Sequence, residues 1–259
     1  GLPAFKQYYK EEKTRELVLE SIYDTVPIKS NRDTTIYSDV GAIILGEIVE
    51  KISGLPLNVF ADSMIFKPLG MGTTFFNPPS NKMRRIVPTE FKPDGTIVHG
   101  YVHDENAYSL GGVAGHAGLF STAKDLAVFS QMMLNDGLYG WKRIFKTETV
   151  NEFTTKANVV DGSSRLLGWD SPGGYASGGI YLSDNSFGHT GFTGTSMWID
   201  PDQGIIVILL TNAVHPNRKN KSPKYYDWRQ RIHSAVYESL SIINKNPNLK
   251  LRPRWEEGE

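Results

Sequence analysis

The segment 187–201 constrains the fold more than any other part of this 259-residue chain. It is polar and glycine-rich at its start, with His189, Gly191 and Gly194, and apolar at its end. Turn residues then lead into the fully apolar run 205–210, which predicts a hairpin whose second strand is buried on both faces. Because glycine weakens strands, these glycines indicate that a ligand or another backbone comes close. A bulged strand with an incidental histidine is the alternative.

The order Gly188-His189-Thr190-Gly191 before a hairpin resembles the Lys-Thr-Gly element of serine β-lactamases and penicillin-binding proteins. The histidine form resembles the class C-like branch, which also holds esterases and D-alanyl carboxypeptidases. In that family the strand edges the active site, and a backbone N–H helps to bind the oxyanion. The resemblance implies that this donor is the Phe192 N–H. It also implies that His189 shapes the field near the substrate and that Thr190 and Gly191 contact it.

A second motif, Tyr37-Ser38-Asp39, opens an apolar-periodic helix predicted for 39–53, with Ser38 or Asp39 as its cap. From the residues alone this is a capped helix start with a buried ring. It is also similar to the family's Tyr-x-Asn motif, which implies that Tyr37 is the general base. Asp39 departs from that pattern. A carboxylate only accepts hydrogen bonds whereas an amide also donates, so amide recognition of the penicillin type does not follow.

The family's third element is a nucleophile in Ser-x-x-Lys upstream of the tyrosine, and residues 1–36 contain no such pattern. The literal match Ser121-Thr122-Ala123-Lys124 opens a predicted helix at 122–135, where Thr122 and Asp125 form a capping pair. We therefore interpret Ser121 as a helix start. The resemblance implies the C-terminal part of a hydrolase domain without its nucleophile helix, and the missing N-terminal segment of the same protein is an expected partner.

Pattern and resemblance together predict an α+β, β-lactamase/transpeptidase-like fold, in which helices and a helical lobe flank an antiparallel sheet. An incomplete domain is expected over 1–243, with the lobe at about 37–160 and the sheet hairpins and last helix at about 161–241. The polar tail 244–259 is expected to be loosely held. Strands are predicted near 165–169, 177–182, 186–199 and 204–211, and further helices at 56–65, 147–154 and 225–240, the last burying Trp228, Ile232, Val236 and Leu240.

Composition narrows the functional classes. Lys and Arg number 28 and so do Asp and Glu, so a nucleic-acid partner has no electrostatic support. The absence of cysteine excludes disulfides and thiol nucleophiles. These residues contain no signal peptide and no apolar span of membrane length. The resemblance implies a periplasmic or cell-envelope location and no cofactor. Loss of the nucleophile helix predicts exposed apolar patches and self-association.

The remaining histidines allow two further interpretations. His99, His103 and Asp104 are residue types that bind zinc, which makes a metal-assisted hydrolase a weaker rival. The favoured interpretation has no metal site. His116 lies in the glycine-rich stretch 112–118, where unusual backbone angles or a close approach are expected. It is either a hydrogen-bonded loop residue or a residue that lines the substrate.

The sequence therefore predicts a serine acyl hydrolase that acts on an ester, a D-alanyl peptide or a β-lactam through an acyl-serine intermediate. This chain lacks the nucleophile, so it is expected to be inactive alone. In some relatives such a module follows a glycoside hydrolase, so a peptidoglycan-type substrate and a fused glycosidase are among the expected partners. The alternative is a non-catalytic module of the same fold that binds cell wall or peptide.

Overall fold

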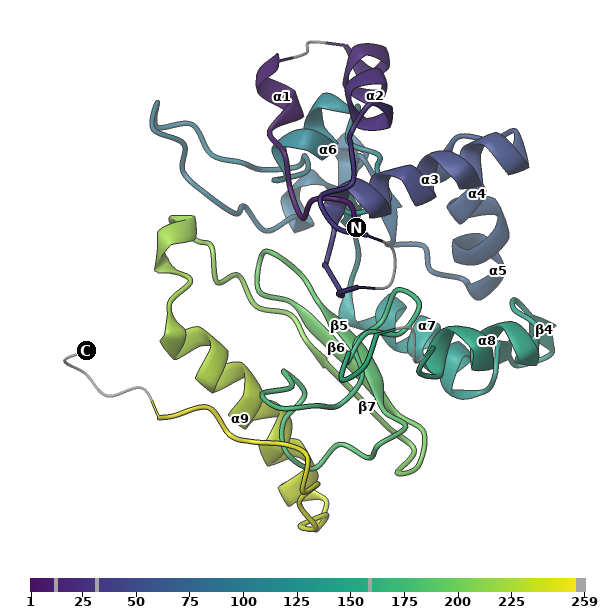
Figure 1. Ribbon diagram of the computed structural model, residues 1–259, viewed down its shortest axis with the longest axis vertical. Coiled ribbons are helices and arrows are strands. Elements are labelled where there is room, and N and C mark those ends of the chain that lie inside the picture. The colour runs from purple at the N-terminus through teal and green to yellow at the C-terminus, as the bar shows by residue number, and fades with distance from the viewer. Residues whose placement is uncertain (12–13, 31–32, 158–159, 255–259) are drawn as a thin grey trace. The chain divides into compact units, whose positions relative to one another are not determined.

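The computed structural model describes residues 1–11, 14–30, 33–157 and 160–254. The chain divides into two compact units (Figure 1). Unit 1 comprises Gly1–Asp125 with Val159–Asp161, and unit 2 comprises Leu126–Asn158 with Gly162–Glu259. The predicted α+β class is confirmed, because helices accompany small antiparallel sheets.

Unit 1 is mainly helical, and its short sheet is a single pair of strands. Its elements are α1 (Tyr8–Glu11), α2 (Arg15–Tyr23), α3 (Asp39–Ser53), α4 (Leu57–Ala61), a π-turn (Asp62–Phe66), α5 (Lys67–Leu69), β1 (Phe75–Phe76), a 3-10 helix (Ser80–Arg85), α6 (Glu105–Ser109) and β2 (Leu119–Phe120). The helix predicted for 56–65 therefore continues to Leu69. Helix α7 (Ala123–Leu134) begins in unit 1 and ends in unit 2.

Helix α3 forms where its sequence predicts it. Ser38 is the cap, because its Oγ accepts a hydrogen bond from the Gly41 N–H at 3.0 Å. The helix ends at Gly54, whose φ of 69° is the left-handed conformation that favours glycine. Val40 and Ile43 pack into a core that also contains residues of α1, α2 and α6. The start of α3 is thus fixed by both a cap and a core.

The loop that carries His116 packs tightly against α3. A Cβ at Gly115 would lie 2.0 Å from the Ala42 carbonyl oxygen, and one at Gly46 would lie 3.0 Å from the Gly115 nitrogen. Only glycine at both positions allows this approach. The glycines of 112–118 therefore seat the loop on the helix.

The sheet of unit 2 has the order β5 (Phe187–Thr190), β6 (Ser196–Asp200) and β7 (Ile205–Leu209), all antiparallel. The hairpin of β6 and β7 is confirmed, with Asp200 opposite Ile205. The prediction of one strand over 186–199 is wrong, because a turn separates β5 from β6, closed by a bond from the Gly191 N–H to the Thr195 carbonyl at 2.8 Å. Burial of β7 on both faces is also wrong, since Val207 is its only buried residue.

The strands predicted at 165–169 and 177–182 do not form. Arg165 and Asp170 make an isolated bridge, and Asp170 makes a second one with Gly188 on β5. In the other segment the Ile180 N–H bonds to the Ser234 hydroxyl at 3.2 Å, and the Ile180 carbonyl accepts from the Asn246 N–H at 2.8 Å. Because these backbone groups find partners outside any strand ladder, the apolar run packs as a loop.

Helix α9 (Pro223–Ser239) lies beside the sheet of unit 2 (Figure 1), but of the four side chains predicted to be buried only Val236, which is partly buried, packs against the core. Trp228, Ile232 and Leu240 are 54%, 45% and 56% exposed. The buried face is polar because β6 and its surroundings offer hydrogen-bond partners. His233 Nε2 bonds to the Ser196 hydroxyl at 2.9 Å, and the Tyr237 hydroxyl donates to Asp200 at 3.0 Å.

Unit 2 also contains β3 (Leu138–Tyr139), β4 (Lys142–Arg143), α8 (Thr147–Thr154) and a 3-10 turn (Arg218–Asn220). The start of the C-terminal tail is held rather than loose. Leu249 is 8% exposed and pairs with Gly174, and the Gly174 N–H bonds to the Asn248 carbonyl at 3.0 Å. Residues 255–259 lie outside the described part of the chain.

Candidate active site

In unit 1, Tyr37 stands immediately before α3. The Ser38 hydroxyl donates to the Pro3 carbonyl at 2.6 Å, and the Asp39 N–H donates to the Ala4 carbonyl at 2.9 Å. Two bonds to the N-terminal segment therefore fix the turn that carries the tyrosine. The Tyr37 side chain is 51% exposed, so the interpretation with a buried ring is wrong. An exposed phenol on a fixed turn is available for proton transfer.

Asp39, Asp104 and His116 form an electrostatic cluster behind this turn. His116 Nε2 bonds to Asp104 Oδ1 at 2.8 Å, and the His116 side chain is only 2% exposed. Burial raises the pKa of Asp39 above its usual value; the His116 charge opposes this shift and Asp104 adds to it. Burial also acts to raise the pKa of Asp104, but the hydrogen bond and charge of His116 and the backbone N–H groups of Ala107 and Asn106 hold it below the usual value.

The residues of the metal-site rival have separate partners. His99 Nε2 lies 2.9 Å from the Ile86 carbonyl, and His103 Nε2 lies 2.9 Å from Glu90 Oε2. Asp104 pairs instead with His116. Within the described residues, no group of three His, Cys, Asp or Glu side chains is arranged to hold a metal ion. The geometry gives this rival no support.

Ser121 lies just before α7, as expected from its capping pattern. Its hydroxyl bonds to the Thr74 hydroxyl at 2.8 Å, and Thr122 Oγ1 accepts from the Asp125 N–H at 3.3 Å. The Asp125 carboxylate accepts further bonds from Thr73 and Thr74. These contacts explain the Ser-x-x-Lys match as a helix start.

In unit 2, His189 on β5 has a polar partner at each ring nitrogen. Its Nδ1 lies 2.8 Å from the Thr190 carbonyl, and its Nε2 lies 3.3 Å from Arg165 Nη1. Arg165 also pairs with Asp170 at 2.9 Å. Burial raises the pKa of Asp170, while the charges of Arg165, His189 and Arg229 oppose the rise.

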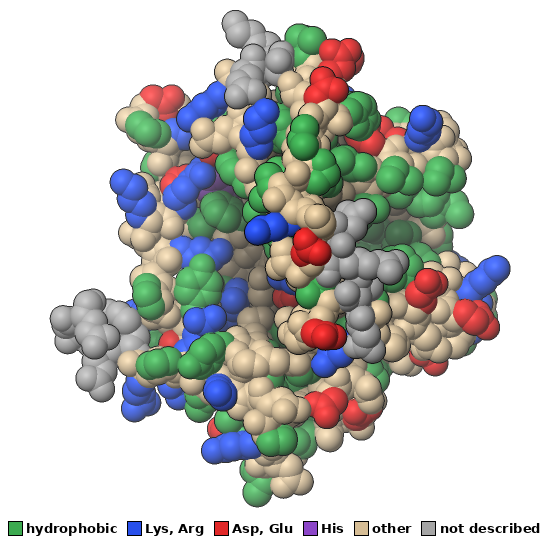
Figure 2. All heavy atoms as spheres, in the orientation of Figure 1, with side chains coloured by type: hydrophobic (Ala, Val, Ile, Leu, Met, Phe, Trp, Pro, Cys, Tyr) green, Lys and Arg blue, Asp and Glu red, His purple; other side chains and the backbone are tan. Residues whose placement is uncertain are grey.

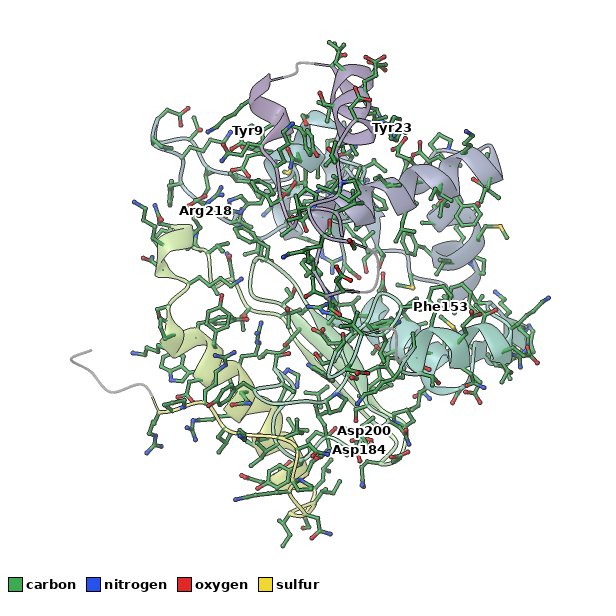
Figure 3. All side chains as sticks on the ribbon, in the orientation of Figure 1. Tyr9, Tyr23, Phe153, Asp184, Asp200 and Arg218 are labelled. Atoms are coloured by element: carbon green, nitrogen blue, oxygen red, sulfur yellow. The ribbon has the colours of Figure 1, made fainter. Side chains whose placement is uncertain are left out.

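Phe192 lies in the turn between β5 and β6, and its ring is 52% exposed. The Phe192 carbonyl accepts from Lys221 Nζ at 2.6 Å, and Lys221 and Arg218 both lie over the ring. Figure 3 labels Arg218 near the start of α9. The Gly194 carbonyl accepts from the hydroxyls of Thr211 and Tyr225. This turn is therefore fixed from both sides.

Cations gather behind the Phe192 turn, and sequence reasoning missed them. Arg229 is only 7% exposed, and its Nε has no hydrogen-bond partner among the described residues. Its guanidinium lies over the rings of Tyr225 and Tyr226. Burial lowers the pKa of Lys221, and the charge of Arg229 lowers it further. The sequence of 217–221 is typical of a solvated loop, and its density of Lys and Arg is the one signal in it of the cations near the Phe192 turn.

Each unit thus brings together its own predicted residues. Unit 1 brings His116, from the 112–118 loop, and Asp104 close enough to act on Asp39 at the start of α3, and Asp104 was not predicted for this role. Unit 2 gathers His189, Thr190, Gly191 and Phe192 on β5 and the turn after it. That the two groups face one nucleophile remains a prediction.

Comparison with known proteins identifies the family. The model of the beta-lactamase family matches residues 1–231. A protein of Salmonella gallinarum named "Putative D-alanyl-D-alanine carboxypeptidase" is 38% identical over 240 residues, which are 83% of this chain and 55% of that protein. An Escherichia coli protein of the same name is 38% identical over 244 residues, with the same shares. The chain spans about half the length of these relatives.

Solved structures agree on the fold. A beta-lactamase from Mycobacterium bovis has a TM-score of 0.56 at 22% identity and covers 80% of this chain and 65% of its own. Simvastatin synthase from Aspergillus terreus has a TM-score of 0.61 at 16% identity and covers 89% and 63%. The β-lactamase/transpeptidase-like fold is therefore confirmed. This chain belongs to the beta-lactamase family.

Proposed function

We propose that this chain supplies the general base and the oxyanion donor of a serine acyl hydrolase, and that the nucleophilic serine comes from polypeptide outside these 259 residues. The observation that supports this most is the Gly-His-Thr-Gly strand β5 with its fixed Phe192 turn, in a chain of the beta-lactamase family. The names of the relatives support hydrolysis of a D-alanyl peptide. A cell-envelope location goes with that activity. In the described chain, no helix is long and apolar enough to cross a membrane.

The reaction assigns a step to each residue. The exposed Tyr37 side chain accepts the serine proton as the serine attacks the acyl carbon, and it returns the proton to the leaving group as the bond between that group and the acyl carbon breaks. The Phe192 N–H stabilises the oxyanion, an effect worth about 3 kcal/mol per donor. His189, whose Nδ1 lies 2.8 Å from the Thr190 carbonyl, is held on the strand that edges the proposed site and shapes the field near the substrate. Water then cleaves the acyl-serine ester.

The charge of unit 2 suggests the substrate class. The charges of Arg165 and Arg229 act on Asp170, and the charge of Arg229 also acts on Lys221, so positive charge is in excess in this cluster. A buried arginine whose Nε lacks a partner favours an anion. We infer that the substrate carries a carboxylate, as D-alanyl peptides and β-lactams do and simple esters do not. Figure 2 shows Lys and Arg side chains, in blue, over the region of α9.

The proposed base is tested by labelling the full-length protein that contains these residues with a fluorophosphonate. Tyr37→Phe is expected to slow labelling at least a hundredfold, because the proton acceptor is lost. Ser121→Ala is the matched control and is expected to change the rate less than twofold. A hundredfold loss in Ser121→Ala would identify that serine as the nucleophile. Stoichiometric labelling of the 259-residue chain alone would also contradict the proposal.

The substrate class is tested with an anionic D-alanyl peptide and a neutral activated ester. Arg229→Met is expected to raise KM for the peptide about tenfold or more and to leave the ester within about twofold, since only the peptide presents a carboxylate. Equal effects on both would exclude a carboxylate site. If the full-length protein binds the peptide with no turnover and no labelling, the non-catalytic binding module is the better description.

A further inference from the structure

Asp39 is a carboxylate at the position where the family element has an amide. It is the first residue of α3, and its backbone N–H is fixed on the Ala4 carbonyl at 2.9 Å. Its side chain is partly buried, and within the described chain its carboxylate makes no hydrogen bond. A half-buried carboxylate with no hydrogen bond is costly unless charge nearby offsets it. Such charge lies behind it.

His116 supplies that charge, and the fold holds it in place. Its ring is enclosed, with Nε2 on Asp104 at 2.8 Å, and its Nδ1 has no hydrogen-bond partner among the described residues. Asp104 is fixed in turn, because the same Oδ1 accepts from the Ala107 N–H at 2.8 Å at the start of α6. The tight contact of Gly115 with α3 sets the distance between ring and helix. Three elements thus converge on one imidazole.

We propose that Asp104 and His116 are a positioning pair for Asp39, and that these three residues together replace the single amide of the Tyr-x-Asn element. In this arrangement Asp104 orients the imidazole, and the imidazole sets the charge of Asp39 beside Tyr37. The coupling among Asp39, Asp104 and His116 involves only residues of this chain and does not depend on the proposed function. Its consequence for catalysis rests on the proposed function.

The charges give the coupling a sign. The groups that act on Asp39 are His116 and Asp104. Burial raises the Asp39 pKa, the His116 charge lowers it, and Asp104 raises it. Removing His116 is therefore expected to raise the Asp39 pKa further. Asp104 acts in two opposite ways, because its own charge raises the Asp39 pKa whereas its bond to His116 holds the ring that lowers it. A protonated carboxyl both donates and accepts hydrogen bonds, as an amide does. Asp104 and His116 therefore set the pH below which Asp39 resembles asparagine.

The coupling is tested in this chain by following the carboxyl ¹³C signals of Asp39 with pH. His116→Gln is expected to move the Asp39 midpoint to higher pH. With His116→Gln already present, Asp104→Asn is expected to move the midpoint back to lower pH, because only the direct charge of Asp104 then remains. His103→Gln is the control, since it removes another buried histidine–carboxylate pair of unit 1 and is expected to leave Asp39 unchanged. Opposite directions separate a charge effect from general loosening. An unmoved Asp39 midpoint in folded His116→Gln overturns the inference.

The catalytic consequence is tested in the full-length protein with a double-mutant cycle. His116→Gln is expected to lower kcat about tenfold alone but less than twofold when Asp39→Asn is also present, because its effect passes through Asp39. Additive losses contradict the positioning role. If the ¹³C shifts occur as expected but kcat does not respond, the network stands and the proposed function fails.

Discussion

Gly194 is the residue whose backbone most restricts the turn after β5. Its φ is 118°, and an added Cβ would lie 2.9 Å from the backbone nitrogen and the Cβ of Ala213. We expect Gly194→Ala to lower the free energy of unfolding by about 2 kcal/mol more than Gly95→Ala, in which φ is 83° but nothing lies within 4 Å. Urea denaturation of both variants measures the difference, and equal losses would show that the contact with Ala213 is relieved without cost.

At the residue scale, the sequence predicted what local chemistry determines. The cap at Ser38 and the helix start at Ser121 follow from side chains that bond to backbone a few residues away. The Asp104–His116 pair joins positions 12 apart through a loop fold, and the Tyr225 hydroxyl of α9 reaches the Gly194 carbonyl of the turn after β5. No periodicity reports such contacts, so these partners could not be read from the sequence.

At the scale of elements, α9 makes unit 2 sensitive to acid. Burial, helped by the charge of Arg229, lowers the pKa of His233 from 6.5 to about 4. The neutral imidazole therefore contributes stability that is fully present above pH 6.5 and is lost as the pH falls through 4. The shift corresponds to roughly 3 kcal/mol.

We expect His233→Gln to be less stable than the parent chain at pH 7 but to lose less stability between pH 7 and pH 4. Glutamine keeps a partner for Ser196 and has no proton to gain. Denaturation midpoints across this range provide the measurement, with His99→Gln as the control. If His233→Gln loses as much stability between pH 7 and pH 4 as His99→Gln does, another group is responsible for the sensitivity to acid.

The errors at this scale have one physical cause. The apolar spacing of 225–240 predicted a buried stripe of Trp228, Ile232, Val236 and Leu240, but hydrogen bonds to Ser196 and Asp200 turn the polar face inward. The run 177–182 reads as a strand, but its backbone bonds to α9 and the tail. Hydrophobic periodicity indicates which apolar groups are buried, but it does not indicate which polar groups are buried against hydrogen-bond partners.

At the scale of the whole molecule, exposed apolar side chains on α3 predict self-association. Leu45, Ile48 and Ile52 are 64%, 44% and 82% exposed and lie three and four positions apart on one face. We expect sedimentation of the chain to show concentration-dependent oligomers, and the Leu45→Lys/Ile52→Lys variant to sediment as a monomer. Trp141→Lys, at a single position that is 90% exposed, is expected to change nothing. A monomeric parent chain contradicts this prediction.

The charge of the chain is balanced in number but not in position. Residues 218–254 contain ten Lys and Arg but only Asp227 and Glu238 as acids. We expect the chain to bind a sulfonate resin at pH 7 and low salt despite its zero formal charge. Lys219→Ala with Lys245→Ala and Lys250→Ala is expected to elute at clearly lower salt than the equally charged control Lys6→Ala with Lys10→Ala and Lys51→Ala. Equal elution would exclude a localised basic region.

The two hydrogen bonds between α9 and β6 also restrict how unit 2 can move. His233 and Tyr237 lie one helical turn apart, and their partners Ser196 and Asp200 stand at opposite ends of the strand, with Asp200 labelled in Figure 3. Sliding the helix by a turn would break both bonds together, so helix and strand form one rigid body. A ligand that reaches this part of unit 2 then meets helix and strand as one unit, and backbone relaxation measurements on free and inhibitor-bound protein are expected to show both responding together.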